Sequence, residues 1–219
     1  MNKLPAIAIT CAFLLGACAI QPIKAPPPTT NRGGIALDIR THAFAHSTLF
    51  LIKVEDKENL KTPEIIAVNT CPRTRCYLFN AEPGTYAIVA IARARRPISQ
   101  SARVGSGSIT VTGRTTHTYF FEEDSMRKSF IQVEPGKLTV VGGIFFFLRH
   151  RGLAQASPLQ KFYAEKIVPG STSKDQTGFF VFQHTAHFKE INKDPVFMAK
   201  FKEAMQKELL GTGWLERLK

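Results

Sequence analysis

The thiols of Cys71 and Cys76 stand five positions apart, in the run CPRTRC. In an oxidising compartment, an even pair at this spacing most simply forms a disulfide that closes a tight loop. A six-residue ring stabilises a fold by about 2 kcal/mol in the loop-entropy estimate. A redox pair is the alternative, because Arg73 and Arg75 would favour a thiolate, but the spacing lacks the two-residue gap typical of redox motifs. A structural disulfide is therefore predicted.

A further cysteine, Cys18, directly follows the run LLGA, and Lys3 leads the apolar segment before it. The apolar stretch is too short to cross a bilayer as a helix, and Gly16 and Ala17 are the small residues that a signal peptidase requires. This arrangement resembles the leader and lipobox of a bacterial lipoprotein. The resemblance implies that residues 1–17 are a signal peptide and that Cys18 becomes an acylated amino terminus. The alternatives are an ordinary secretory leader with a chance cysteine, or an uncleaved anchor helix.

The residue after this cysteine is Ala19 rather than Asp. In the lipoproteins that the leader resembles, this implies transfer to the outer membrane, where the chain would be lipid-anchored and face the periplasm. The inner membrane is the alternative location. Two or three buried acyl chains, at about 0.8 kcal/mol per methylene, hold such a protein firmly on the bilayer.

Positive charge dominates the composition, with 29 Lys and Arg against 17 Asp and Glu and a net charge of +12. Such a field favours anionic partners, but an exported protein does not meet nucleic acid. The anions of an envelope are phospholipid head groups, lipopolysaccharide phosphates and peptidoglycan carboxylates. The densest basic cluster consists of Arg93, Arg95, Arg96 and Arg103, and it is a candidate anion-binding site. The alternative is a solvated loop between two strands.

No arrangement of residues indicates catalysis, a metal or a cofactor. His42 and His46 would lie about 13 Å apart on a strand, too far to share one ion. His184 and His187 could meet only in a turn, and no acidic or thiol ligand stands near them. The sequence contains no Gly-x-Ser-x-Gly, His-Glu-x-x-His or complete phosphate-loop motif. A non-enzymatic protein is predicted, with a hydrolase whose active site is scattered along the chain as the remaining catalytic alternative.

The elements that would position these residues begin after a Pro-rich stretch. Residues 18–34 have almost no apolar content after the cysteine, so they are predicted to form an extended tether about 40 Å long. Residues 35–219 are expected to fold as one domain. Val, Ile, Phe, Tyr and Thr gather there in short runs separated by turn residues. Residues 94–107 read as a loop. The predicted fold is mainly β: an antiparallel β-sandwich with one C-terminal α-helix.

Glu-Pro-Gly occurs twice between predicted strands, at residues 82–84 and 134–136. Proline and glycine suit the two corners of a type II turn, so each copy is predicted to close a hairpin. With these turns, residues 35–148 resemble carboxypeptidase-regulatory-like and related Pro-Gly-turn β-sandwich domains of lipoproteins. The resemblance implies a binding or spacer module without catalytic residues.

The last part of the chain, from about residue 160, is predicted to contain strands at 161–168 and 178–184 and then a helix. Asp194 and Pro195 suit the start of this helix, and one face of it carries an apolar stripe of Phe197, Phe201, Met205 and Leu209. The predicted function is a membrane-anchored binding or structural module that contacts anionic envelope polymers. The alternative is a subunit of an envelope complex that uses this helix or the Phe179–Phe182 hairpin to contact another protein.

Overall fold

The computed structural model describes residues 22–40, 47–68, 70–149, 152–168 and 181–218. The strands in this part of the chain are β1 (Gly33–Arg40), β2 (Ser47–Val54), β3 (Ile66–Val68), β4 (Arg75–Ala81), β5 (Gly84–Val104), β6 (Gly107–Phe121), β7 (Ile131–Val133), β8 (Leu138–Arg149) and β9 (Val181–Asn192). The helices are α1 (Glu123–Lys128), α2 (Pro158–Ile167) and α3 (Pro195–Glu208), with short 3-10 turns at Leu153–Gln155 and Leu215–Arg217. The prediction of a mainly β protein is confirmed.

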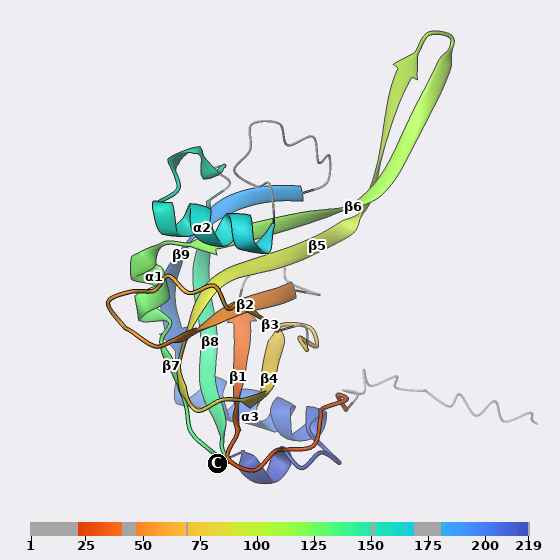
Figure 1. Ribbon diagram of the computed structural model, residues 1–219. Coiled ribbons are helices and arrows are strands. Elements are labelled where there is room, and N and C mark those ends of the chain that lie inside the picture. Colours follow the sequence, from red (N-terminus) through yellow and green to blue (C-terminus); the bar gives the residue numbers. More distant parts are fainter. Residues whose placement is uncertain (1–21, 41–46, 69, 150–151, 169–180, 219) are drawn as a thin grey trace, which may run out of the picture.

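All the strands belong to one sheet in the order β3-β2-β5-β6-β9-β8-β1-β4, and β7 pairs with β5 outside this path. The ends of the order, β3 and β4, come into contact, so the sheet curls into a nearly closed, barrel-like form (Figure 1). The pairs β1–β8 and β6–β9 are parallel and the other pairs are antiparallel. The predicted antiparallel sandwich is therefore wrong: the sheet is mixed, and it is a single curled sheet. Both parallel pairs join strands far apart in sequence, which local patterns do not reveal.

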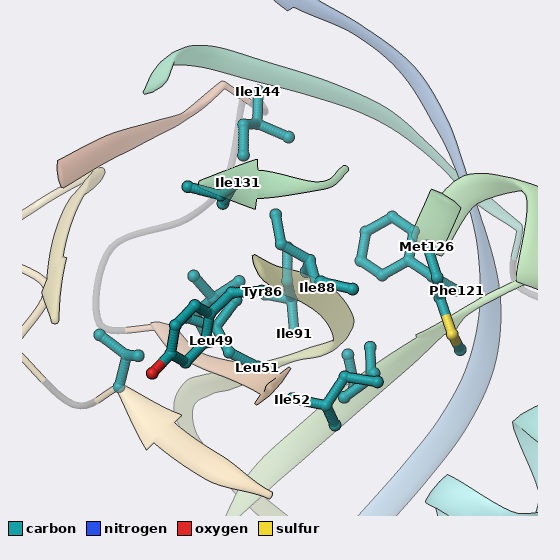
Figure 2. Packing of buried hydrophobic residues seen from close by; sticks show 14 of the residues in the cluster. Leu49, Leu51, Ile52, Tyr86, Ile88, Ile91, Phe121, Met126, Ile131 and Ile144 are labelled. Atoms are coloured by element: carbon teal, nitrogen blue, oxygen red, sulfur yellow. The ribbon is translucent and has the colours of Figure 1, made fainter. Parts of the chain in front are cut away.

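The main hydrophobic core lies inside the curled sheet. Ile35, Leu37 and Ile39 of β1 belong to this core, whereas Ala36 belongs to a second cluster with residues of α3. Figure 2 shows part of the main core, where aliphatic side chains of β2 and β5 meet Phe121 of β6. The alternation along β1 follows the two-residue period of a strand, so the two faces of the sheet bury different partners.

Helix α3 packs on the outside of the sheet with the second cluster and agrees with its prediction, whereas Met126 of α1 and Tyr163 and Ala164 of α2 belong to the main core. The Asp194 side chain accepts a hydrogen bond from the Phe197 N–H at 2.9 Å, and Pro195 stands in the first turn. Three apolar residues of the predicted stripe, Phe201, Met205 and Leu209, are buried. None of the helices in the described part of the chain has the length and hydropathy that a membrane span requires.

Helix α2 replaces the strand predicted at residues 161–168. Ser157 and Gln160 form a capping box, in which each side chain bonds to the other residue's backbone N–H. Pro158 occupies the first turn, a position that favours a helix start. The prediction was wrong because the start signal lies just before the segment that was read as a strand.

The Pro-rich segment from Pro22 to Arg32, here called the N-terminal segment, packs against the domain. The backbone N–H of Ile23 bonds to the carbonyl of Glu208 at 2.9 Å. The indole N–H of Trp214 bonds to the carbonyl of Pro26 at 2.8 Å. The predicted extended tether is therefore wrong for these residues, since carbonyls of the segment accept hydrogen bonds from Trp214 and Arg217 in the C-terminal part of the chain. Residues 18–21 lie outside the described part.

The two Glu-Pro-Gly runs connect strands that do not pair with each other. The first joins β4 to β5, and the second joins β7 to β8, yet β7 pairs with β5. Gly84 and Gly136 have φ of 144° and 71°, values that favour glycine. Only the second run forms a turn, in which the Lys137 N–H bonds to the Glu134 carbonyl, whereas Gly84 already belongs to β5. Both predicted hairpins were wrong because the chain continues to a distant partner strand.

Candidate functional site

The most distinctive surface feature is a two-stranded arm formed by residues 95–115. Below it, β2 pairs with β5 as far as Arg93, and β9 pairs with β6 from Thr116 onward. Beyond these residues β5 and β6 pair only with each other in the described part of the chain, as far as Val104 opposite Gly107. Figure 1 shows the arm projecting from the curled sheet, at the end of the molecule away from α3. The predicted loop at residues 94–107 is therefore wrong.

The tip and the base of the arm follow from local sequence. At the tip, Gly105 has φ of 62°, as the first residue of a type II′ hairpin turn requires. At the base the register shifts between Ala94 and Pro97, so Arg95 and Arg96 form a β-bulge. A bulge bends its strand, and proline lacks a backbone donor for a further neighbour. The arm therefore leaves the sheet at these residues.

The predicted basic cluster lies along this arm rather than in one pocket. Arg93 stands below the bulge, Arg95 and Arg96 form it, and Arg103 is exposed near the tip. At about 3.3 Å per residue, Arg93 and Arg103 are roughly 33 Å apart. The structure describes only the backbone of Arg95 and Arg96. The arrangement suits a long anionic chain better than one small anion.

Sequence reasoning left out a fifth arginine, Arg114, which pairs with Pro97 across the base of the arm. Between Glu82 and Glu122 the sequence contains five arginines and neither aspartate nor glutamate. No carboxylate in the arm can therefore neutralise its cations. A count of both charge signs over residues 83–121 would have revealed this.

The register places different residue types on the two faces of the arm. Paired residues share a face, so Ala102 lies with Ile109 and Gln100 with Val111, whereas Arg103 lies with Ser108. One face is thus largely apolar in sequence, and the other carries Ser, Thr and Arg. An isolated two-stranded hairpin is at best marginally stable in water, so the arm is suited to contact something outside the described fold.

A cluster of aromatic and histidine side chains lies next to the base of the arm. His117 of β6 pairs in register with Arg93, and its Nδ1 lies 3.0 Å from Nε2 of His184 on β9. Both histidines are buried. The rings of Tyr119 and Phe182 stack on this pair, and Phe182 is 43% exposed. This pairing could not be predicted from local sequence, because the two histidines are 67 positions apart and lie on parallel neighbouring strands.

Cys71 and Cys76 form the predicted disulfide, with an S–S distance of 2.05 Å. Both residues are buried and belong to the main core, so the disulfide is a structural bond within that core. Cys18 lies outside the described residues, as do His42 and His46.

The alternative of a scattered active site gains no support from the described residues. His187 Nδ1 lies 2.8 Å from a carboxylate oxygen of Glu122, the kind of pair that orients a general base. Among the residues that the structure describes, the other ring nitrogen, Nε2, has no hydrogen-bond partner, so none of their hydroxyl groups is bonded to it. His184 and His187 lie on opposite faces of β9. The described part of the chain contains no cluster of three or more His, Cys, Asp or Glu residues that could hold a metal.

A buried ion pair fastens α3 to the sheet. Arg75 Nε bonds to both carboxylate oxygens of Glu208 at 2.9 Å, and the Tyr77 hydroxyl donates to Glu208 at 2.6 Å. Burial, together with this hydrogen bond, raises the pKa of Tyr77 well above its usual range. Because the helix is held and its apolar stripe is covered, α3 has no free apolar stripe for a partner. Of the Phe179–Phe182 segment, the structure describes only Val181 and Phe182, the start of β9.

Comparison with known proteins gives one distant likeness. The chain is similar to a proposed carbohydrate-binding protein from Pseudomonas aeruginosa, with 15% sequence identity and a TM-score of 0.18. The likeness covers 42% of this chain and 81% of that protein. A likeness of this degree says nothing about what the present chain binds. No protein family model and no curated protein matches the chain.

Proposed function

We propose that this chain is a lipid-anchored binding module of the bacterial envelope whose arm binds an anionic envelope polymer. The observation that carries the proposal is the projecting arm with its base, where five arginines and no carboxylate lie between Glu82 and Glu122. Charges spread along roughly 33 Å match a polymer with repeated anionic groups. The partly exposed ring of Phe182 beside the base of the arm offers an apolar contact next to these cations.

The anchoring part of the proposal rests on Cys18 and the leader before it. Acylation there would hold the domain at the outer membrane, facing the periplasm, with the inner membrane as the alternative. Expression of the full chain in a bacterial host, with and without Cys18→Ala, tests this part. We expect a mature mass that begins at Cys18 and includes acyl chains, and we expect the variant to leave the membrane fraction. An unmodified mass that is insensitive to the variant would refute the anchor.

The binding part can be tested with purified peptidoglycan sacculi and with lipopolysaccharide as separate probes. The test variant is Arg95→Gln with Arg96→Gln and Arg103→Gln. If each of the three charges contributes about 0.5 kcal/mol, removing them amounts to roughly a tenfold loss of affinity at low salt. Binding by the wild-type protein should also weaken steeply as sodium chloride rises, because salt screens exposed charges.

The matched control removes three exposed lysines elsewhere on the domain, Lys57, Lys128 and Lys202. It lowers the net charge by the same amount but leaves the arm intact, so its affinity should stay within about threefold of the wild type. Equal losses in the two triple variants would mean that net charge, not the arm, attracts the polymer. Salt-insensitive binding would contradict an electrostatic contact altogether.

A protein partner in an envelope complex is the second candidate, and the largely apolar face of the arm favours it. A partner could cover this face or extend the arm by pairing with its free edges. In that case the arm should crosslink in cells to another envelope protein, and the Ala102→Lys variant should abolish the crosslink. The three arginine substitutions would then have little effect.

A further inference from the structure

The start of the described chain is fixed beside the last turn of α3. The Ile23 N–H bonds to the Glu208 carbonyl, and the Ile23 side chain packs against the cluster that contains Met205 and Leu209. Asn80 reinforces this arrangement further along: its side chain accepts a bond from the Thr29 N–H at 2.8 Å. The N-terminal segment is therefore part of the folded domain. A membrane anchor at Cys18 would connect to this domain at Pro22.

Only three residues lie between Cys18 and Pro22, so four residue-to-residue steps connect them. A fully extended chain advances at most about 3.6 Å per residue, so the connection spans no more than about 14 Å. An acylated Cys18 would therefore keep the end of α3 close to the bilayer. The proposed spacer length of about 40 Å is lost once the N-terminal segment is packed against the domain.

The surface at this end of the molecule has features that suit a bilayer. Leu210, just after α3, is 62% exposed. It borders a shallow groove of about 450 Å³ whose other lining residues are Glu203, Gln206, Lys207 and Leu215. Lys24 is exposed on the adjoining N-terminal segment. Lys207 forms an exposed ion pair with Glu203 of this groove. An exposed leucine beside lysines is the pattern by which a surface inserts apolar groups among anionic head groups.

We infer that the end of α3 around Leu210, together with Lys24 and Lys207, is the surface that rests on the anionic phospholipid bilayer. This inference rests on the proposed acylation at Cys18, which sets the short connection. It adds an orientation: α3 lies against the membrane, and the arm, at the opposite end of the molecule in Figure 1, points away from it.

The test supplies the anchor chemically, so it does not depend on acylation in cells. Protein that begins at Cys18 is joined through its amino-terminal cysteine to a thioester phospholipid in vesicles of phosphatidylcholine and phosphatidylglycerol. A fluorescent noncanonical amino acid replaces Leu210, and doxyl-labelled lipids serve as quenchers. The control carries the same fluorophore at Ser106, an exposed residue at the tip of the arm.

We expect the lipids to reduce fluorescence at position 210 at least twofold and to leave position 106 unchanged. A second labelled position, Gln206 in the groove, should be quenched like position 210. It serves as a check in case the fluorophore at position 210 disturbs the end of the helix. Quenching at positions 210 and 206 no greater than at position 106 would overturn the inference. A failure of acylation would instead appear only in the mass measurement in cells, so the two failures are distinguishable.

Discussion

At the scale of single residues, the contact between Arg75 and Glu208 shows how one buried pair joins two parts of the chain. The Glu208 side chain is only 2% exposed, and its partner is 14% exposed. Hydrogen bonds from Arg75 and Tyr77 replace the water that the carboxylate loses. A buried charge whose partner is removed remains costly, so each member of the pair depends on the other.

Glu208→Gln should therefore lower the free energy of unfolding by about 3 kcal/mol, because it leaves the Arg75 guanidinium with a neutral partner. Urea denaturation followed by circular dichroism measures this loss. The matched control is Glu203→Gln, on the same helix, which breaks an exposed pair with Lys207 and should cost less than 1 kcal/mol. Equal effects of the two substitutions would show that the buried pair does not fasten α3.

The disulfide provides a second prediction at this scale. Cys71→Ala combined with Cys76→Ala should lower the free energy of unfolding by about 2 kcal/mol, the loop-entropy value for a six-residue ring. Chemical denaturation with and without a reductant measures the loss. The reductant should destabilise the wild type but leave the double variant unchanged. A reductant effect that persists in the double variant would exclude this bond as its cause.

Single residues also mark the limit of prediction from sequence. The Cys71–Cys76 bond could be predicted because its partners are close in the chain. The contact between His117 and His184 could not, because it depends on a parallel pairing of distant strands. The hydrogen bond between Trp214 and Pro26 could not be predicted either, because the two residues are 188 positions apart in the sequence.

At the scale of elements, the arm is the part of the fold with the fewest strand pairings to the rest of the domain. In the described part of the chain its strands pair only with each other beyond the bulge. Replacing residues 95–115 with Asn-Gly would join Ala94 to Thr116, which already face each other, through a turn that favours hairpins. The domain should keep its free energy of unfolding within about 1 kcal/mol, as chemical denaturation would show. Polymer binding should be lost.

The outcome would be informative in either direction. A large loss of stability on removal of the arm would mean that it is a structural part of the domain. Retained polymer binding by the shortened chain would contradict the proposed role of the arm. Retained stability with lost binding is the combination expected of a functional projection.

Strand-forming segments could be predicted from local alternation, and so could α3 from its cap and apolar stripe. Their neighbours could not, because residues 33–40 pair in parallel with residues 138–149 and nothing near either segment indicates this. The arm was read as a loop because Ser, Gly and Arg are common in loops. The Pro-rich N-terminal segment was read as a tether because it lacks apolar residues, yet its carbonyls accept bonds from Trp214 and Arg217.

At the scale of the whole molecule, the proposed anchor and the arm belong to opposite ends of the domain. The described chain begins beside α3, and Figure 1 shows the arm at the other end of the curled sheet. Charge interactions are screened within about 8–10 Å at physiological salt. The arm would therefore contribute little to holding the domain on its own membrane. In the proposed function, its cations would therefore meet an anionic polymer that lies farther from the bilayer.

This geometry predicts that the point of attachment decides whether the polymer can bind. Protein attached through Cys18 to a supported lipid bilayer should bind soluble peptidoglycan fragments with an affinity within about threefold of the free protein. The same chain attached through Ser106→Cys, with Cys18→Ser, should lose at least tenfold, because the tip of the arm then faces the lipid. A quartz crystal microbalance measures both. If attachment through Cys18 were the one that blocked binding, the arm would face the anchoring membrane, and the anions that it meets would be lipid head groups.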